Sequence, residues 1–168
     1  MVVMDETSCM VAIAKFYLEF TCEESCGKCS PCRIGNKRML EILDKITKGN
    51  GTMQDLQELR NLADVIKDTA LCGLGQTSPN PVLSTLDNFW DEYVEHVVDK
   101  KCRACACKSL MSYEIDPTKC IGCGACKRVC PQDAISGEKK LAHHIDNLKC
   151  IKCGACYEKC KFGAISIK

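Results

Sequence analysis

The pattern of apolar and polar positions along the chain changes near residue 100. Before that point, apolar residues recur every three or four positions, as they do in amphipathic helices. We therefore predict four helices, at about residues 9–22, at residues 34–47, from a cap at Thr52, and from Pro79 and Pro81 onward. After residue 100, short apolar segments alternate with glycines, and residues 113–115 and 165–167 are expected to pair as outer strands.

Each predicted helix carries an apolar stripe that we expect to face a shared core, which predicts a small bundle. The expected core positions, helix by helix, are Ala12, Ile13, Phe16, Tyr17 and Phe20; Met39, Leu40, Ile42, Leu43 and Ile46; Leu56, Leu59, Leu62, Ala63 and Ile66; and Leu83, Leu86, Phe89, Trp90, Tyr93, Val94 and Val97. In the second half, His143 and His144 are expected to be exposed strand residues of a hairpin.

Length, charge and hydropathy narrow the class of protein. The 168 residues suffice for one or two small domains. The early apolar stretch Met10–Phe20 is interrupted by Lys15 and Glu19 and falls short of the roughly 20 apolar residues that a membrane span needs. No secretory signal is visible, and the high cysteine content favours a reducing compartment. We therefore expect a cytoplasmic protein with no membrane span.

The net charge of +1 is divided unevenly along the chain. Residues 1–100 hold 10 basic and 16 acidic side chains, whereas residues 101–168 hold 13 basic and 6 acidic ones. A basic tail can indicate nucleic-acid binding, but many of these lysines adjoin cysteines. We interpret most of them as compensating the negative charge of metal–thiolate groups, with docking of an acidic redox partner as the alternative for some, and expect no nucleic-acid partner.

Twelve of the 17 cysteines form three sets, each a C-x2-C-x2-C run with a separate fourth cysteine. In the tail, two runs follow the bacterial two-cluster ferredoxin spacing, in which the fourth cysteine of each run ligates the cluster of the other. This predicts one 4Fe–4S cluster on Cys120, Cys123, Cys126 and Cys160, and another on Cys150, Cys153, Cys156 and Cys130. A disulfide scaffold or zinc ribbon is the competing interpretation, but ribbons use pairs rather than runs of three.

The third set lies within the predicted bundle. Its run precedes the second helix and its fourth cysteine follows the third helix, so a cluster here would join two helices; the set is Cys26, Cys29, Cys32 and Cys72. The positive end of the second helix dipole would favour the negative charge of such a cluster. We therefore expect an α+β protein: a helical bundle holding one 4Fe–4S cluster at residues 1–99, a cysteine-rich linker at 100–112, and a two-cluster ferredoxin domain at 113–168.

Five cysteines lie outside these sets, and three of them fall in the linker close to His96. Because zinc accepts sulfur and imidazole in tetrahedral sites, we predict a structural zinc on Cys102, Cys107 and His96. The fourth ligand is left open between Cys9 and Cys105. The alternative is a group of free thiols beside a histidine at a helix end, and Cys22 is expected to be a small core residue.

The cluster motifs carry a resemblance to a known family. Glu24-Ser25-Cys26-Gly27-Lys28-Cys29, Pro31-Cys32-Arg33 and Leu71-Cys72 resemble the C-terminal iron–sulfur domain of the NADH-binding flavoprotein subunit of respiratory complex I. With its ferredoxin tail, the chain is similar to the beta subunit of NAD-linked, electron-bifurcating iron hydrogenases of anaerobes, and to related NADP-reducing hydrogenase and formate dehydrogenase subunits. The resemblance favours Cys9 as the fourth zinc ligand.

The resemblance implies that the bundle cluster accepts electrons from a flavin and that the tail passes them onward. FMN and NAD(P) would be held by a domain or subunit missing from this sequence, since no G-x-G-x-x-G loop occurs in it. Expected partners are this flavin-bearing part, a hydrogenase-type or thioredoxin-like ferredoxin subunit, and soluble ferredoxin. One departure is Lys161, where the second run of a ferredoxin often has proline.

Three functions are therefore compared. The chain is expected to be the electron-transfer part of an NAD(P)-linked oxidoreductase, with no catalytic centre of its own. The alternatives are a stand-alone soluble polyferredoxin and a zinc-binding scaffold without redox activity. Iron content separates the scaffold from the other two, and co-purification with a flavoprotein separates the first from the second.

Overall fold

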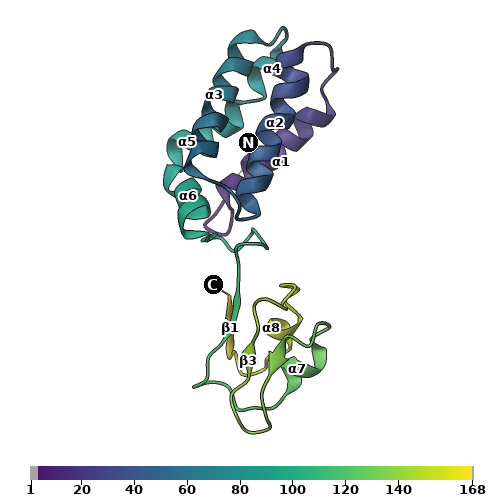
Figure 1. The fold of residues 1–168 in the computed structure, drawn as a ribbon, viewed down its shortest axis with the longest axis vertical. Helices are drawn as coiled ribbons and strands as arrows, with labels where there is room; N and C mark the ends of the chain where they lie inside the picture. The colour runs from purple at the N-terminus through teal and green to yellow at the C-terminus, as the bar shows by residue number, and fades with distance from the viewer. Residues whose placement is uncertain (1–3, 168) are drawn as a thin grey trace. The chain divides into compact units, whose positions relative to one another are not determined.

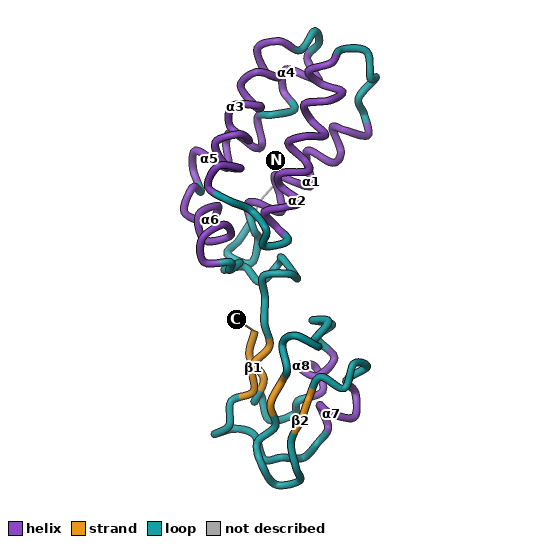
Figure 2. Tube along the Cα trace, viewed as in Figure 1, coloured by secondary structure: helices purple, strands orange, loops and turns teal. Residues whose placement is uncertain are grey.

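A computed structural model describes residues 4–167, and the chain divides into two compact units, the first ending at Leu110 and the second starting at Met111. Among the described residues, the long helices belong to the first unit and the strands to the second, so the protein is of the α+β class (Figures 1 and 2). The described helices are all too short or too polar to cross a membrane.

The first unit is built from helices joined by short loops (Figure 1). Its α-helices are α1 (Met10–Glu23), α2 (Asn36–Thr47), α3 (Met53–Thr69), α4 (Gly73–Thr77), α5 (Asn80–Asn88) and α6 (Trp90–Val94). There are also two π-helical turns among the described residues. The turn η1 (Pro31–Gly35) leads directly into α2, and η2 (Glu95–Asp99) directly follows α6. Such wide turns occur mostly as single turns within α-helices and are frequent at functional sites.

The bundle core lies between α1, α2, α3 and α5, which pack against one another. The start of α3 is fixed by a capping box, in which Thr52 Oγ1 accepts from the Asp55 N–H and the Asp55 carboxylate accepts from the Thr52 N–H. The predicted stripes of α2 and α3 are confirmed at their buried positions, which are Met39, Ile42, Leu43 and Ile46, and Leu56, Leu59, Ala63 and Ile66. Cys102, Cys107 and Leu110 belong to the same core, so residues expected as a linker pack with the helices.

The predicted buried face of α1 is wrong. Phe16 and Phe20 are 62% and 53% exposed, whereas Val11, Ala14 and Leu18 are fully buried. The helix is apolar around most of its circumference, so periodicity alone did not select one stripe. The smaller side chains face the core, where α1 packs against both α2 and α5.

The fourth predicted helix is also not continuous. It divides into α5, α6 and η2, and the break falls at Phe89, whose φ of −133° and ψ of 37° lie outside the helical region. Phe89 and Trp90 are consequently exposed, while Tyr93 and Val97 remain in the core.

The second unit is a duplicated ferredoxin-like fold with a repeat of 30 residues. Strand β1 (Tyr113–Ile115) pairs antiparallel with β4 (Ile165–Ile167), as predicted, and β2 (Ile135–Ser136) pairs with β3 (His144–Ile145). Helices α7 (Ala125–Val129) and α8 (Ala155–Lys159) each follow a glycine in the left-handed region, Gly124 and Gly154. His144 is exposed, but the prediction of exposure for His143 is wrong, since only 5% of its surface is accessible.

Candidate functional site

The first cysteine set lies in a loop that its own side chains fold. Ser25 Oγ accepts a hydrogen bond from the Gly27 N–H, and the Arg33 guanidinium donates to the Gly27 carbonyl at 2.7 Å. Gly27 has a φ of 71°, a conformation that favours glycine. The loop leads into η1, which contains Cys32. This brings a run of three cysteines to the beginning of the helical segment that continues as α2.

The fourth cysteine of this set reaches the same region from the end of α3. Cys72 precedes α4, and the adjacent Leu71 N–H donates to the sulfur of Cys29. This bond, together with one from the Cys32 N–H, holds the pKa of the Cys29 thiol below its usual range. Gly75 faces Cys32 so closely that an added Cβ would lie 3.3 Å from the Cys32 Cβ. The two segments that carry the four cysteines are therefore in contact.

The eight cysteines of the second unit line two separate cavities. Cys120, Cys123, Cys126 and Cys160 line one cavity. Cys130, Cys150, Cys153 and Cys156 line the other. Each cavity therefore combines one run of three with the distant cysteine of the other run, the crossed arrangement expected from the spacing. Apolar side chains provide most of the remaining walls; they include Ile115, Ile121, Phe162 and Ile165 in the first cavity and Ile135, Ile145 and Ile151 in the second.

Backbone N–H groups point to cysteine sulfurs in the second unit. Ala134 N–H donates to Cys130 Sγ at 3.3 Å, and Lys152 N–H donates to Cys150 Sγ at 3.4 Å. Such bonds stabilise thiolates and the negative charge of a thiolate-ligated cluster. The donor set, the cavities and these N–H groups fit a 4Fe–4S cluster at each of the two positions.

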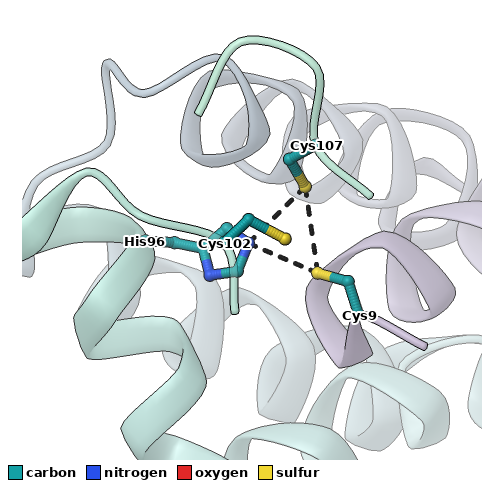
Figure 3. A group of neighbouring side chains, drawn as sticks. All are labelled: Cys9, His96, Cys102 and Cys107. Atoms are coloured by element: carbon teal, nitrogen blue, oxygen red, sulfur yellow. Dashed lines mark hydrogen bonds between the residues drawn. The ribbon is translucent and has the colours of Figure 1, made fainter. Parts of the chain in front are cut away.

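A third group of side chains gathers in the first unit, outside the cluster sets. The ligand atoms of Cys9, His96, Cys102 and Cys107 all lie within 4.8 Å of one another (Figure 3). His96 Nε2 lies 3.3 Å from Cys9 Sγ and 3.5 Å from Cys107 Sγ. The sulfurs of Cys9 and Cys107 are 3.8 Å apart. Two thiolates on a tetrahedral zinc, each about 2.3 Å from the metal, are separated by roughly 3.8 Å. The geometry of these side chains therefore fits a tetrahedral zinc.

The imidazole of this group is oriented for metal binding. His96 Nδ1 lies 2.7 Å from the carbonyl oxygen of Glu92, to which its N–H donates, and this leaves Nε2 facing the three sulfurs. The Glu92 carboxylate accepts a hydrogen bond from the Met10 N–H at 3.1 Å, next to Cys9. Glu92 is itself buried. One residue of α6 thus positions the chain segments that carry two members of the group.

Burial and charge distinguish this group from ordinary core cysteines. His96 is inaccessible to solvent, and Cys9, Cys102 and Cys107 are at most 6% exposed. Hydrogen bonds from Cys107 and Cys9, and then from His96, hold the pKa of the Cys102 thiol far below its usual range. Cys105 is not among the four, although sequence reasoning left it open as a ligand. Cys22 is partly buried against the core.

Comparison with known proteins identifies the family. Residues 12–96 match the family described as the NADH-ubiquinone oxidoreductase-F iron-sulfur binding region, and residues 112–161 match a 4Fe-4S dicluster domain. The first match covers half of the chain, so the chain belongs to the NADH-ubiquinone oxidoreductase-F iron–sulfur family. The resemblance stated from the cysteine motifs is thereby confirmed.

Relatives and a solved structure agree with this assignment. The chain is 65% identical over 140 residues to the NADP-reducing hydrogenase subunit HndC of Solidesulfovibrio fructosivorans, covering 83% of this chain and 29% of the relative. It is 41% identical over 98 residues to an NADH-quinone oxidoreductase subunit of Streptomyces coelicolor, covering 58% of this chain and 22% of that one. A crystal structure of an NAD⁺-reducing NiFe hydrogenase in the H2-reduced state matches 56% of this chain and 16% of its own, with 30% identity and a TM-score of 0.55. The chain thus spans less than a third of the length of these relatives.

Sequence reasoning missed two residues that the structure places beside candidate ligands. His143 lines the cavity of Cys120, Cys123, Cys126 and Cys160, and no sequence signal distinguished it from the exposed His144. Asn36 is fully buried next to Cys32. Its signal was available, because Asn36 occupies the same helical stripe as Met39 and Leu43.

Proposed function

We propose that this chain is the iron–sulfur electron-transfer part of an NAD(P)-linked oxidoreductase. The helical unit receives electrons from a flavin and NAD(P)H site on another domain or subunit, and the ferredoxin unit delivers them to ferredoxin or to a hydrogenase-type partner. The observation that carries this proposal is the coincidence of the two family matches with three complete cysteine sets. The hydrogenase and quinone oxidoreductase subunits among its relatives support the choice of reaction class.

Three 4Fe–4S clusters are assigned to the three sets. The bundle cluster is held by Cys26, Cys29, Cys32 and Cys72, and the two ferredoxin clusters by the crossed sets Cys120, Cys123, Cys126 and Cys160, and Cys150, Cys153, Cys156 and Cys130. The crossed lining of the two ferredoxin cavities supports the latter assignments. The contact of Leu71 with Cys29 supports the former.

The contribution of the protein to this function is to hold and insulate the clusters rather than to perform bond chemistry. A bound 4Fe–4S cluster supplies one-electron transfer. The cysteines would ligate the iron, and the N–H groups of Ala134 and Lys152, which donate to Cys130 and Cys150, would stabilise its negative charge. The apolar cavity walls would exclude water. We place the protein in the cytoplasm because its many cysteines are free thiols, which a reducing compartment preserves from disulfide formation.

The proposal is tested by anaerobic reconstitution of the full chain with iron and sulfide. We expect about twelve iron atoms and twelve acid-labile sulfides per chain, and EPR signals of three reduced clusters after dithionite treatment. A Cys29→Ser variant should lose about four irons, and Cys22→Ser, outside the three sets, should lose none. Colourless protein without labile sulfide would refute the proposal. Co-purification of the chain with a flavoprotein would favour the oxidoreductase part over a stand-alone polyferredoxin.

We further propose that Cys9, His96, Cys102 and Cys107 hold a structural zinc. The support is the tetrahedral spacing of their ligand atoms, their burial and the orientation of the imidazole. The metal would join the start of α1, the end of the helical segment and the cysteine-rich segment before Leu110. Element analysis should find one zinc per chain in addition to the iron.

A further inference from the structure

A short chain of buried polar groups ends at one cysteine of the bundle set. The side-chain nitrogen of Asn36 lies 3.5 Å from Cys32 Sγ, and the Ser78 hydroxyl lies 2.9 Å from the Asn36 side-chain oxygen. Asn36 is inaccessible to solvent and Ser78 is 2% exposed. The Ser78 hydroxyl is also 2.9 Å from the carbonyl oxygen of Gly75, which ties the group to α4. Two buried polar side chains, one at the start of α2 and one at the end of α4, therefore form a chain that ends at one sulfur.

The chemistry of the sulfur determines which way the amide points. A thiolate that ligates iron only accepts hydrogen bonds, so the NH2 group of Asn36 is the end that faces it. The Asn36 oxygen then faces the Ser78 hydroxyl, whose single hydrogen is shared between that oxygen and the Gly75 carbonyl. A buried asparagine in a helix stripe destabilises the core unless both ends of the amide are bonded. Here both ends are bonded, and one of the two partners is the candidate ligand.

Cys32 differs from the other three cysteines of its set in its surroundings. Cys26 and Cys72 are exposed and Cys29 is partly buried, whereas Cys32 is buried. Water can therefore hydrate the exposed sulfurs, but the hydrogen bonds to Cys32 come from the protein. Ser25 Oγ, at 3.3 Å, is a second polar neighbour of this sulfur, although it comes from the loop and not from the buried chain.

We propose that Asn36, oriented by Ser78, is a positioning residue that donates a hydrogen bond to the Cys32 thiolate and raises the reduction potential of the bundle cluster. The inference depends on the proposed function, because it requires a cluster on Cys26, Cys29, Cys32 and Cys72. One-electron reduction adds one negative charge to the cluster without breaking a bond. A donor to a ligand sulfur stabilises this more negative state more than the oxidised one, so the potential rises.

The test is an EPR-monitored redox titration of the full, anaerobically reconstituted chain, with dithionite as reductant. In Asn36→Leu, one of the three midpoints should fall. At a fixed ambient potential, the ratio of reduced to oxidised cluster should drop about tenfold, which equals about 59 mV for a one-electron couple. The other two midpoints should not move. Ser78→Ala removes only the group that holds the amide in place, so the same midpoint should fall by less.

A matched control and two outcomes keep the inference falsifiable. Asn61→Leu, at an exposed position of α3, should leave all three midpoints unchanged. Unchanged midpoints in both Asn36→Leu and Ser78→Ala, with full iron content, would overturn the inference and leave the proposed function intact. Loss of four irons in Asn36→Leu with no shift in Ser78→Ala would assign the pair a purely structural role and would also overturn it. Absence of a cluster from the parent bundle would refute the proposed function itself.

Discussion

Replacing Cys102 by serine tests the zinc proposal most directly. Cys102 is 1% exposed, and its thiol pKa is strongly lowered by bonds from Cys107, Cys9 and His96. A serine hydroxyl is not deprotonated under these conditions and is a much weaker zinc ligand than a thiolate. We therefore expect Cys102→Ser to lose the single zinc while retaining about twelve irons. Element analysis of both metals in the same sample measures this.

The loss of zinc should also destabilise the helical unit by a measurable amount. A ligand that binds only the folded state stabilises it by about 4 kcal/mol when its free concentration is 1,000 times its Kd. For a domain of about 100 residues, each kcal/mol changes the Tm by about 4–8 °C. The expected decrease in Tm, followed by circular dichroism of the helices, is therefore roughly 15–30 °C.

Cys105 provides the matched control for this substitution. It lies in the same segment, is partly buried, and is outside the group of four. Cys105→Ser should keep one zinc per chain and nearly the parent Tm. Retention of zinc with an unchanged Tm in Cys102→Ser, or loss of zinc in Cys105→Ser, would refute the assignment of ligands.

Three other substitutions test the helix cap of α3, the hydrogen bond at the start of α1, and a tight loop of the second unit. Thr52→Ala removes the capping box of α3 and should lower the free energy of unfolding by about 1 kcal/mol in denaturant titrations, whereas an unchanged value would contradict a role for the cap. Glu92→Ala leaves the buried Met10 N–H without its acceptor and should destabilise the helical unit by about 1–3 kcal/mol, with Glu92→Gln milder because its amide oxygen still accepts. Gly122 has a φ of 69°, and a Cβ added there would lie 2.5 Å from the backbone of Leu141, so Gly122→Ala should lose about four irons. Lys152→Ala, at the equivalent position of the repeat, should keep all of its iron.

The sequence predicted those elements whose pattern leaves few alternatives. The stripes of α2 and α3, the Thr52 cap and the pairing of β1 with β4 were expected and are present. Cysteine spacing also led to the grouping of the ferredoxin cysteines now found around two cavities. These features depend on local periodicity or on fixed spacings, which a sequence displays directly.

The remaining features depend on tertiary packing that periodicity does not encode. In α1, the aromatic Phe16 and Phe20 suggested a buried face, but the small Ala14 lets the helix approach its neighbours closely. The break at Phe89 has no proline or glycine to mark it. Asn36 was passed over because a single polar residue in an apolar stripe becomes meaningful only when its partners, Cys32 and Ser78, are located.

The two π-helical turns make the register of this domain sensitive to chain length. Cys32 lies in η1 and His96 lies in η2, each within a stretch that holds one residue more than ordinary helical winding would. Deleting a single residue there would restore regular winding, and the residue that the wide turn now presents, Cys32 or His96, would lose its present position. The four-residue spacing that joins Asn36 to Cys32 would be lost by a deletion between them, and that joining His96 to the Glu92 carbonyl by a deletion between those two. In these two stretches, insertions and deletions should be far more damaging than conservative substitutions.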